Sequence, residues 1–310
     1  MLKCTAFEPI EEIPVQSHIP SSDMPGDKVL IQPIHLEKAN YILSSLPRLL
    51  DEIFSESKNG RIVLSICGNS GSGKTESAAL LVYALNNICI GAYAISGDNY
   101  PHRIPKYNDA ERLGIFRIEG TRELIARGIY TEERQRTLAE LQKIETDASP
   151  TEVTAHPWLA VYQQGGDNGL RRYLGTQREI DFAELSAIVS QFKNGADEIF
   201  LKRMGREDDA TWYEAVSFKN TDVLIVEWTH GNNDNLRGID VPIMLYNTPE
   251  ETLAHRKARG RDSKADSPFV TRVLNIETEL LLSQAHKAKL IISGKCEPIS
   301  IGKLRQFSAV

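Results

Sequence analysis

GNSGSGKT, from Gly68 to Thr75, is a glycine-rich stretch that lies between two regular patterns of the chain. The apolar run RIVLSIC at residues 61–67 predicts a buried strand before it, and TESAALLVYALNN at residues 75–87 predicts a helix after it. Glycines let the backbone pass close to a phosphate and point its N–H groups inward, and the start of a helix adds a positive dipole. The spacing GxxxxGK[ST] in this setting predicts a P-loop for a nucleoside triphosphate, rather than a tight turn that contains Lys and Thr by chance.

Two side chains of this loop have direct chemical roles in such a site. We expect the Lys74 ammonium group to reach the β- and γ-phosphates of ATP, and the Thr75 hydroxyl group to bind Mg²⁺. The other residues that we expect to contact the nucleotide are Gly68, Asn69, Ser70, Gly71, Ser72, Gly73 and Glu76.

Further short apolar runs predict the rest of a sheet. The expected strands are residues 88–96, 221–228, 241–247 and 288–293, and the expected helices around them are residues 36–54, 248–260 and 267–286. Short buried strands that alternate with helices are typical of a parallel sheet covered on both faces. The sequence therefore predicts an α/β protein with a P-loop NTPase fold.

Two regions stand outside this alternation. Residues 1–59 form an N-terminal extension, in which we expect a strand at residues 28–32 and the helix at 36–54, kinked or split at Pro47. Residues 109–220 look mostly helical, with expected helices at 109–128, 131–145 and 179–195 and a loop-rich stretch at 156–176. We interpret about 109–178 as a helical insertion in a main domain of residues 60–310.

Composition excludes several classes of protein. The net charge of −6 and the lack of a long basic run argue against nonspecific nucleic-acid binding. The four cysteines are far apart, without the spacing of zinc ligands, and we expect mostly buried free thiols. We find no apolar leader and no apolar stretch near the ~20 residues of a membrane span. We therefore expect a cytoplasmic protein with no membrane or nucleic-acid partner, and a homodimer is compatible with the sequence.

Asp98 lies in ISGDNYPHR at residues 95–103, just after the second predicted strand. The loops at the carboxyl ends of parallel strands form the ligand crevice of such sheets. Asp98 is therefore a candidate to accept a proton from a substrate hydroxyl group, with the capping of a turn as the alternative. Tyr100, His102 and Arg103 are candidate substrate contacts in the same loop.

Glu227 ends the most apolar predicted strand, in DVLIVEWTHGNN at residues 222–233. An acid in this place commonly serves the metal-bound phosphates, and the alternative is a salt-bridged strand end. We expect Glu227 to act in catalysis and to bind the metal together with Thr75. His230, three residues later, is either a substrate ligand or an ordinary loop histidine.

The basic stretch HRKARGRDSK at residues 255–264 follows the fourth predicted strand. Arg256, Arg259 and Arg261 could stabilise charge on a phosphoryl group during its transfer. The alternative is a solvated basic helix end that interacts favourably with the helix dipole.

Together these motifs resemble the uridine kinase and phosphoribulokinase family of P-loop kinases, which also includes pantothenate kinase and glycerate kinase. GNSGSGKT is similar to the family pattern GxSGxGKT, GDNYPHR to its turn GDSFHR, and LIVEWTH to its strand ending in EGxH. The resemblance implies that Asp98 is the catalytic base and that Glu227 lies by the metal and substrate. It also implies a lid at about residues 254–268, whose arginines close over ATP. Trp228 in place of a small residue, and the segment 126–177, depart from the family pattern.

These observations lead us to expect an ATP- and Mg²⁺-dependent kinase that phosphorylates a hydroxyl group of a small polar metabolite, namely a sugar, a nucleoside or a polyol acid. We expect its acceptor pocket between the Asp98 loop, the insertion and the His230 loop. An adenylylsulfate- or nucleotide-kinase-like enzyme is an alternative, supported by the basic residues Arg103, Lys106, Arg171 and Arg172. A P-loop ATPase that acts as a switch is another.

Overall fold

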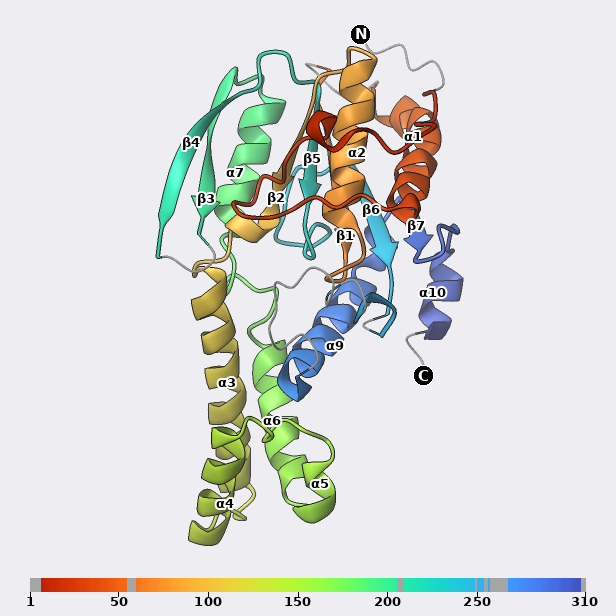
Figure 1. Cartoon of the computed structure of the whole chain (residues 1–310). Helices are drawn as coiled ribbons and strands as arrows, with labels where there is room; N and C mark the ends of the chain where they lie inside the picture. The colour runs from red at the N-terminus through yellow and green to blue at the C-terminus, as the bar shows by residue number, and fades with distance from the viewer. Residues whose placement is uncertain are drawn as a thin grey trace.

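A parallel five-stranded sheet forms the centre of the protein (Figure 1). The computed structural model describes residues 7–54, 60–205, 209–248, 250–253, 256 and 267–307. The strands lie in the order β2-β5-β1-β6-β7. Their bounds are β1 Ile62–Gly68, β2 Ala92–Ser96, β5 Val223–Glu227, β6 Val241–Tyr246 and β7 Leu290–Ser293. All neighbouring strands are parallel, which confirms the predicted α/β class and P-loop fold.

β1 occupies the middle of the sheet because both of its faces are apolar. All seven of its residues are buried. Ile62, Leu64 and Ile66 point to one side, into a core shared with helices α1 and α2, whereas Val63 points to the opposite core. This alternation is what a strand covered on both faces requires.

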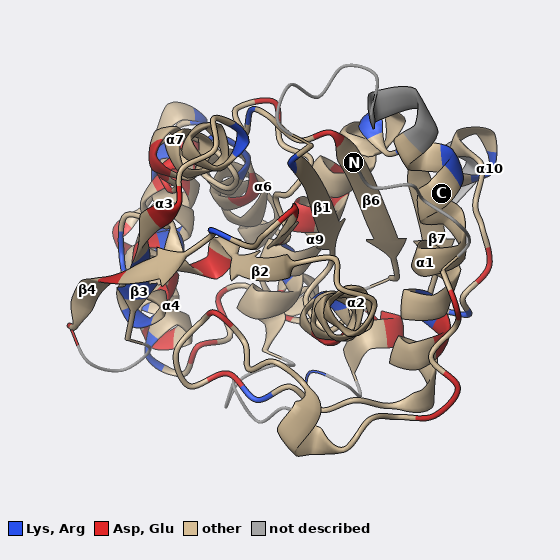
Figure 2. Cartoon of the chain, turned by 90° about the horizontal axis from the view of Figure 1, so that it is seen from above, with Lys and Arg blue, Asp and Glu red and all other residues tan. Residues whose placement is uncertain are grey.

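Helices cover both faces of the sheet, as Figure 2 shows from above. α1 (Pro33–Phe54) and α2 (Lys74–Asn87) lie on one face, and α7 (Phe182–Lys193), α9 (Pro268–Ser283) and the short α10 (Ile301–Phe307) contribute to the other. α1 runs as one helix through Pro47 and is not split there. Among the described helices, none is both long and apolar enough to cross a membrane.

The insertion forms a helical arm that projects from the carboxyl edge of the sheet (Figure 1). It contains α3 (Pro105–Ala126), α4 (Glu132–Lys143), α5 (Glu152–Ala155) and α6 (Leu159–Arg171). The loop expected at residues 156–176 is wrong, because most of that stretch is α6. Its glycines allow close helix packing: a Cβ atom on Gly165 would lie 2.5 Å from the Cβ atom of Glu123 in α3, and Gly166 packs against Phe116 in the same way.

An antiparallel hairpin follows α7, in a part of residues 109–220 where no strand was expected. β3 (Glu198–Met204) pairs with β4 (Thr211–Ser217), and Arg203 faces Trp212 across the pair. β4 is almost wholly exposed, so it lacks the apolar signal that marks the strands of the main sheet. A two-stranded sheet of this kind depends on neighbouring elements for stability.

The N-terminal segment, residues 7–32, crosses the outer side of α2 and reaches the hairpin (Figure 1). The strand expected at residues 28–32 is absent; apart from the short 3-10 helix η1 (Gln16–His18), the described segment has no regular structure. Val29 packs against Ala79 of α2 instead of pairing with a sheet edge. Met24 reaches farther and packs against Ile104 and Met204.

The described cysteines are free and differ in exposure. Cys67 is buried at the end of β1, and Cys296 is partly buried. Cys89 is exposed, and its φ of 61° places it in the turn that follows α2. Of the three described cysteines, one is therefore fully buried, which is fewer than the mostly buried thiols that we expected. Cys4 lies outside the described residues.

Candidate active site

The glycine-rich loop connects the end of β1 to the first residue of α2. Gly71 and Gly73 have φ values of 81° and 85°, a left-handed conformation that favours glycine. The amide of Ser72 donates to the carbonyl oxygen of Asn69 at 3.1 Å, which closes the turn. The Asn69 side chain donates in turn to the carbonyl oxygen of Asn247 at 2.6 Å and ties the loop to the end of β6.

Lys74 and Thr75 begin α2 and lie on the inner side of this turn. The Lys74 ammonium group donates to the carbonyl oxygen of Asn69 at 3.0 Å, so it folds back over the loop. The Thr75 hydroxyl group donates to Oε2 of Glu227 at 3.2 Å. Glu76 follows them and is buried. The loop thus brings one cation and one hydroxyl group to the carboxyl edge of the sheet, next to an acid from a neighbouring strand.

Glu227 is the last residue of β5 and is only 6% exposed. Burial, followed by the negative charge of Asp98, raises the pKa of Glu227 to about 8, and Lys74 acts in the opposite direction. Mg²⁺ in phosphate-transfer sites is typically held by one or two protein oxygen ligands together with phosphates and water. The adjacent oxygens of Thr75 and Glu227 fit that requirement. Among the described residues, no cluster of three or more His, Cys, Asp or Glu forms a metal cage.

Asp98 lies in the short 3-10 helix η2 (Gly97–Asn99) directly after β2. The register of the sheet pairs Ser96 with Glu227, so Asp98 comes two residues beyond the partner of Glu227. Asp98 is exposed whereas Gly97 and Asn99 are buried. An exposed carboxylate at this edge is placed where a ligand on the loop could reach it.

The three other residues of the Asp98 loop have different surroundings. Tyr100 is fully buried in the core beneath α7, and burial raises the pKa of its hydroxyl group, so we remove it from the candidate substrate contacts. His102 is exposed, with Nε2 at 3.0 Å from the carbonyl oxygen of Gln177. The Arg103 guanidinium group donates to the Tyr173 hydroxyl at 3.3 Å, which ties it to the arm.

His230 is buried and packs edge-on against Trp228, with 5.1 Å between the ring centroids. Burial lowers the pKa of His230 to about 4, although the nearby Glu179 acts in the opposite direction. Its ring also lies against Gly175 of the segment after α6, where a Cβ atom would come within 3.1 Å. His230 therefore joins the loop after β5 to the helical arm as a neutral side chain.

Trp228, which stands where the family pattern has a small residue, is buried in the core. Its indole packs directly on Gly97, and a Cβ atom there would lie 2.0 Å from Cγ of Trp228. It also contacts the ring of Phe182 in α7, and only 2% of it is exposed. The large residue after Glu227 thus fills the core behind Asp98 and does not narrow the crevice in front of it.

Only one of the three candidate lid arginines belongs to the described residues. Arg256 is 6% exposed and packs on the glycine-rich loop, since a Cβ atom on Gly71 would lie 3.0 Å from Cγ of Arg256. Arg259 and Arg261, and most of the expected lid at residues 254–268, lie outside the described residues.

Sequence reasoning missed a contact from the N-terminal helix to the loop. Lys38 of α1 is 3% exposed, and its ammonium group donates to the carbonyl oxygen of Ser72 at 2.9 Å. A signal was present: Lys38 lies in an otherwise buried stripe of α1 with His35, Ala39 and Ile42. A lysine in such a stripe usually needs a buried partner.

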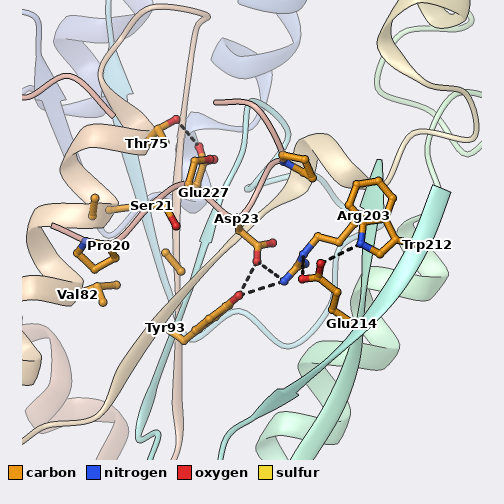
Figure 3. A pocket seen from close by; sticks show the side chains of 15 residues that line it. Pro20, Ser21, Asp23, Thr75, Val82, Tyr93, Arg203, Trp212, Glu214 and Glu227 are labelled. Carbon is orange, nitrogen blue, oxygen red and sulfur yellow. Dashed lines mark hydrogen bonds and ion pairs between the residues drawn. The ribbon is translucent and has the colours of Figure 1, made fainter. Parts of the chain in front are cut away.

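Two cavities border this loop. The hairpin cavity, between residues 20–25, α2, β2 and the β3–β4 hairpin, has a volume of about 510 Å³ and reaches Thr75 and Glu227 (Figure 3). The arm cavity, between α3 and α9, has a volume of about 430 Å³ and reaches the loop at Ser70. The sheet order, the glycine-rich loop and the acid beside it define a P-loop nucleotide-binding protein.

Comparison with known proteins gives one extended sequence match. The chain is 38% identical over 232 residues to the bifunctional alpha-galactosidase/sucrose kinase AgaSK of Mediterraneibacter gnavus. The match covers 75% of this chain and 20% of that protein, so the chain spans about a fifth of the length of this relative. No protein-family model matches the sequence.

Two solved structures are similar over most of the chain. A D-glycerate 3-kinase from Cryptococcus neoformans is 13% identical, with a TM-score of 0.49, and the match covers 87% of this chain and 99% of that one. A structure from Bacillus stearothermophilus described as a "Possible Uridine Kinase" is 17% identical, with a TM-score of 0.44, and the match covers 80% and 98%.

Proposed function

We propose that the chain is an ATP-dependent kinase that transfers the γ-phosphate of ATP to a hydroxyl group of a small polar metabolite. The observation that carries the proposal is the meeting of Lys74, Thr75 and Glu227 at the carboxyl edge of the sheet, with the exposed carboxylate of Asp98 beside them. The similarity over 232 residues to a protein whose name includes sucrose kinase supports the same reaction class.

The glycine-rich loop would hold the triphosphate. Backbone N–H groups at the start of α2 and the Lys74 ammonium group provide positive charge where the β- and γ-phosphates would lie. Lys74 donates to the Asn69 carbonyl oxygen, and phosphate oxygens would replace that acceptor. Arg256 packs on Gly71 and would add a second positive charge beside the loop.

Thr75 and Glu227 would hold Mg²⁺ with their two neighbouring oxygens. When bound there, Mg²⁺ would neutralise negative charge that develops on the phosphates during transfer. The buried position of Glu227 keeps water away from one side of this site.

Asp98 would orient the acceptor and receive its proton. In the reaction, the acceptor oxygen forms a bond to the γ-phosphorus, and the bond from that phosphorus to the β–γ bridging oxygen breaks. The hydroxyl proton passes to the Asp98 carboxylate, and ADP leaves. Most of the rate enhancement in such a transfer comes from positioning and charge stabilisation, to which a general base adds roughly 10²–10⁴-fold.

A sugar is the acceptor class that we propose, with sucrose as the first compound to test because of the name of the relative. The test incubates the purified chain with Mg²⁺, ATP and sucrose and follows both ADP release and the phosphorylated product by mass spectrometry. We expect a sugar phosphate with the wild type and none with Lys74→Ala, since removal of that charge weakens transition-state stabilisation.

Three results would contradict the proposal in different ways. ATP hydrolysis at the same rate with and without every hydroxyl acceptor would favour a P-loop ATPase switch. Phosphorylation of adenylylsulfate or of nucleoside monophosphates alone would favour the nucleotide-kinase alternative. A Lys74→Ala variant with wild-type turnover would show that the loop takes no part in the reaction.

A further inference from the structure

The hairpin cavity has one end at the phosphate-transfer site and its other end at the β3–β4 hairpin (Figure 3). Thr75 and Glu227 line the first end, and Arg203, Trp212 and Glu214 line the second. A ligand in this cavity would therefore have one end beside the pair of oxygens that we assign to Mg²⁺. Asp98 is not among the residues that line the cavity, but it follows β2 two residues beyond the partner of Glu227 and so comes at this same end. The arm cavity differs, because it borders the loop only at Ser70 and is lined by neither Thr75 nor Glu227.

The N-terminal segment builds one wall of the hairpin cavity and is anchored there by Asp23. The Asp23 carboxylate, 2% exposed, accepts from the Tyr93 hydroxyl at 2.6 Å and from the Ser96 amide at 3.2 Å, and lies 2.9 Å from Arg203. An aspartate so fully engaged fixes residues 20–25 against β2 and the hairpin. This wall of the cavity is therefore held in place by specific hydrogen bonds and an ion pair.

Arg203 orders the polar groups at the hairpin end. It is 6% exposed and pairs with Asp23 on one side and with Oε2 of Glu214 at 3.0 Å on the other. Oε1 of Glu214 accepts from the Trp212 indole N–H at 2.9 Å. Because each carboxylate oxygen has two lone pairs, Glu214 keeps accepting capacity, and half of its side chain is exposed.

This lining selects the chemistry of a ligand. The charged residues that line the cavity are Asp23, Glu214, Glu227 and Arg203. Arg203 pairs with Asp23, and Glu227 belongs to the site that we assign to Mg²⁺, so the half-exposed carboxylate of Glu214 is the charge that the rest of a ligand would meet. Such a surface repels an anion, and a carboxylate with free lone pairs needs a donor. The ring of Trp212, 38% exposed, adds an apolar face next to these acceptors. A neutral molecule with several hydroxyl groups and an apolar side satisfies all three conditions.

We propose that the hairpin cavity binds the phosphate acceptor, and that the acceptor is a neutral sugar held by Glu214 and the Trp212 ring, with its reacting hydroxyl group toward Thr75 and Glu227. This inference rests on the proposed kinase function. It places the acceptor under the N-terminal segment rather than between the His230 loop and the arm, and it excludes polyol acids and nucleotides as preferred acceptors.

The experiment uses two adjacent residues of β4. Trp212 lines the cavity, whereas Tyr213 points to the other side of the strand and donates to Glu184 at 2.7 Å. Trp212→Ala and Tyr213→Ala each remove a partly exposed aromatic ring and one hydrogen bond to a glutamate from neighbouring positions, so their effects on folding are comparable. Steady-state kinetics with sucrose and with ATP are measured for both variants and for the wild type, together with a thermal unfolding curve.

We expect Trp212→Ala to raise the KM for sucrose about tenfold while the KM for ATP stays within about twofold, because an aromatic contact contributes on the order of a tenfold change in binding. Tyr213→Ala should leave both constants near the wild-type values. Glu214→Gln should raise the KM for sucrose as well and should reduce the preference for sucrose over D-glycerate, since it removes a negative charge.

The outcomes separate this inference from the kinase function. If the wild type phosphorylates sucrose but Trp212→Ala and Tyr213→Ala behave alike, the kinase stands and the cavity assignment is overturned. If the wild type prefers D-glycerate or another anion, the kinase stands and the neutral-sugar assignment is overturned. If no hydroxyl acceptor is phosphorylated, both proposals are overturned.

Discussion

The ammonium group of Lys38 in α1 donates a hydrogen bond of 2.9 Å to the carbonyl oxygen of Ser72 in the glycine-rich loop. The contact joins the N-terminal extension to the phosphate-binding turn. Burial lowers the pKa of Lys38, and nearby acids, including Glu76, partly offset this effect. A residue outside the unit formed by β1, the loop and α2 therefore helps to hold the conformation of the loop.

Lys38→Met tests this relationship. The substitution keeps the length of the side chain and removes the donor, so the Ser72 carbonyl oxygen loses its partner and the turn loses one restraint. Because a hydrogen bond to a charged group contributes about 1.5–3 kcal/mol, we expect the affinity for an unreactive ATP analogue to fall at least about tenfold. Titration calorimetry measures it, with Glu37→Gln on the exposed side of α1 as the control. Unchanged affinity in Lys38→Met would show that α1 does not shape the site.

Asp98→Asn separates binding from chemistry. Asparagine has the same size but cannot receive the acceptor proton, so we expect kcat to fall by roughly 10²–10⁴ with little change in ATP affinity. Rapid-quench turnover and equilibrium ATP binding are measured on the same preparation, and Glu132→Gln at the start of α4 is the control for loss of an exposed carboxylate. A parallel loss of ATP binding would assign Asp98 to the metal or to the structure of the turn.

The buried His230 should make the free energy of unfolding depend on pH. Its pKa is about 4 in the folded protein against 6.5 for an unperturbed histidine, so the unfolded chain binds more protons between these values. Stability is therefore lost as the pH falls from about 6.5 toward 4, by on the order of 2 kcal/mol at about pH 5. Urea unfolding near pH 7 and near pH 5 should show a smaller difference for His230→Gln than for the wild type. Equal differences would mean that the imidazole is already protonated in the folded protein.

Gly97→Ala tests the packing behind Asp98. A Cβ atom at this position would lie 2.0 Å from Cγ of Trp228, and overpacking in a buried site typically costs about 1–3 kcal/mol. The second substitution Trp228→Leu should recover part of that loss, which a double-mutant cycle of unfolding free energies measures. Gly114→Ala in α3, where no atom lies within 4 Å of the added carbon, is the control and should not destabilise the protein. Additive effects at residues 97 and 228 would contradict the contact.

The parts of the fold that sequence reasoning predicted correctly depend on short-range patterns. The P-loop spacing and the apolar strands of the main sheet are of this kind. Helix α6 was predicted as a loop because Gly165 and Gly166 weaken a helix by themselves. In the structure, these two glycines allow α6 to pack closely on α3. The β3–β4 hairpin was missed because an exposed strand has no apolar alternation. Asp23 gave no local signal at all, since its partners come from other parts of the chain.

The path of the N-terminal segment also sets an order of events in folding. Residues 20–25 are synthesised well before Arg203, the partner of Asp23, which follows about 180 residues later in the chain. Contacts between segments so distant in sequence form late, because the chain between them must first be ordered. The wall of the hairpin cavity is therefore completed only after the sheet and the hairpin exist, and a nascent chain that stops before β3 lacks the arginine that Asp23 pairs with. Synthesis of the hairpin is therefore the step that supplies the second end of this cavity.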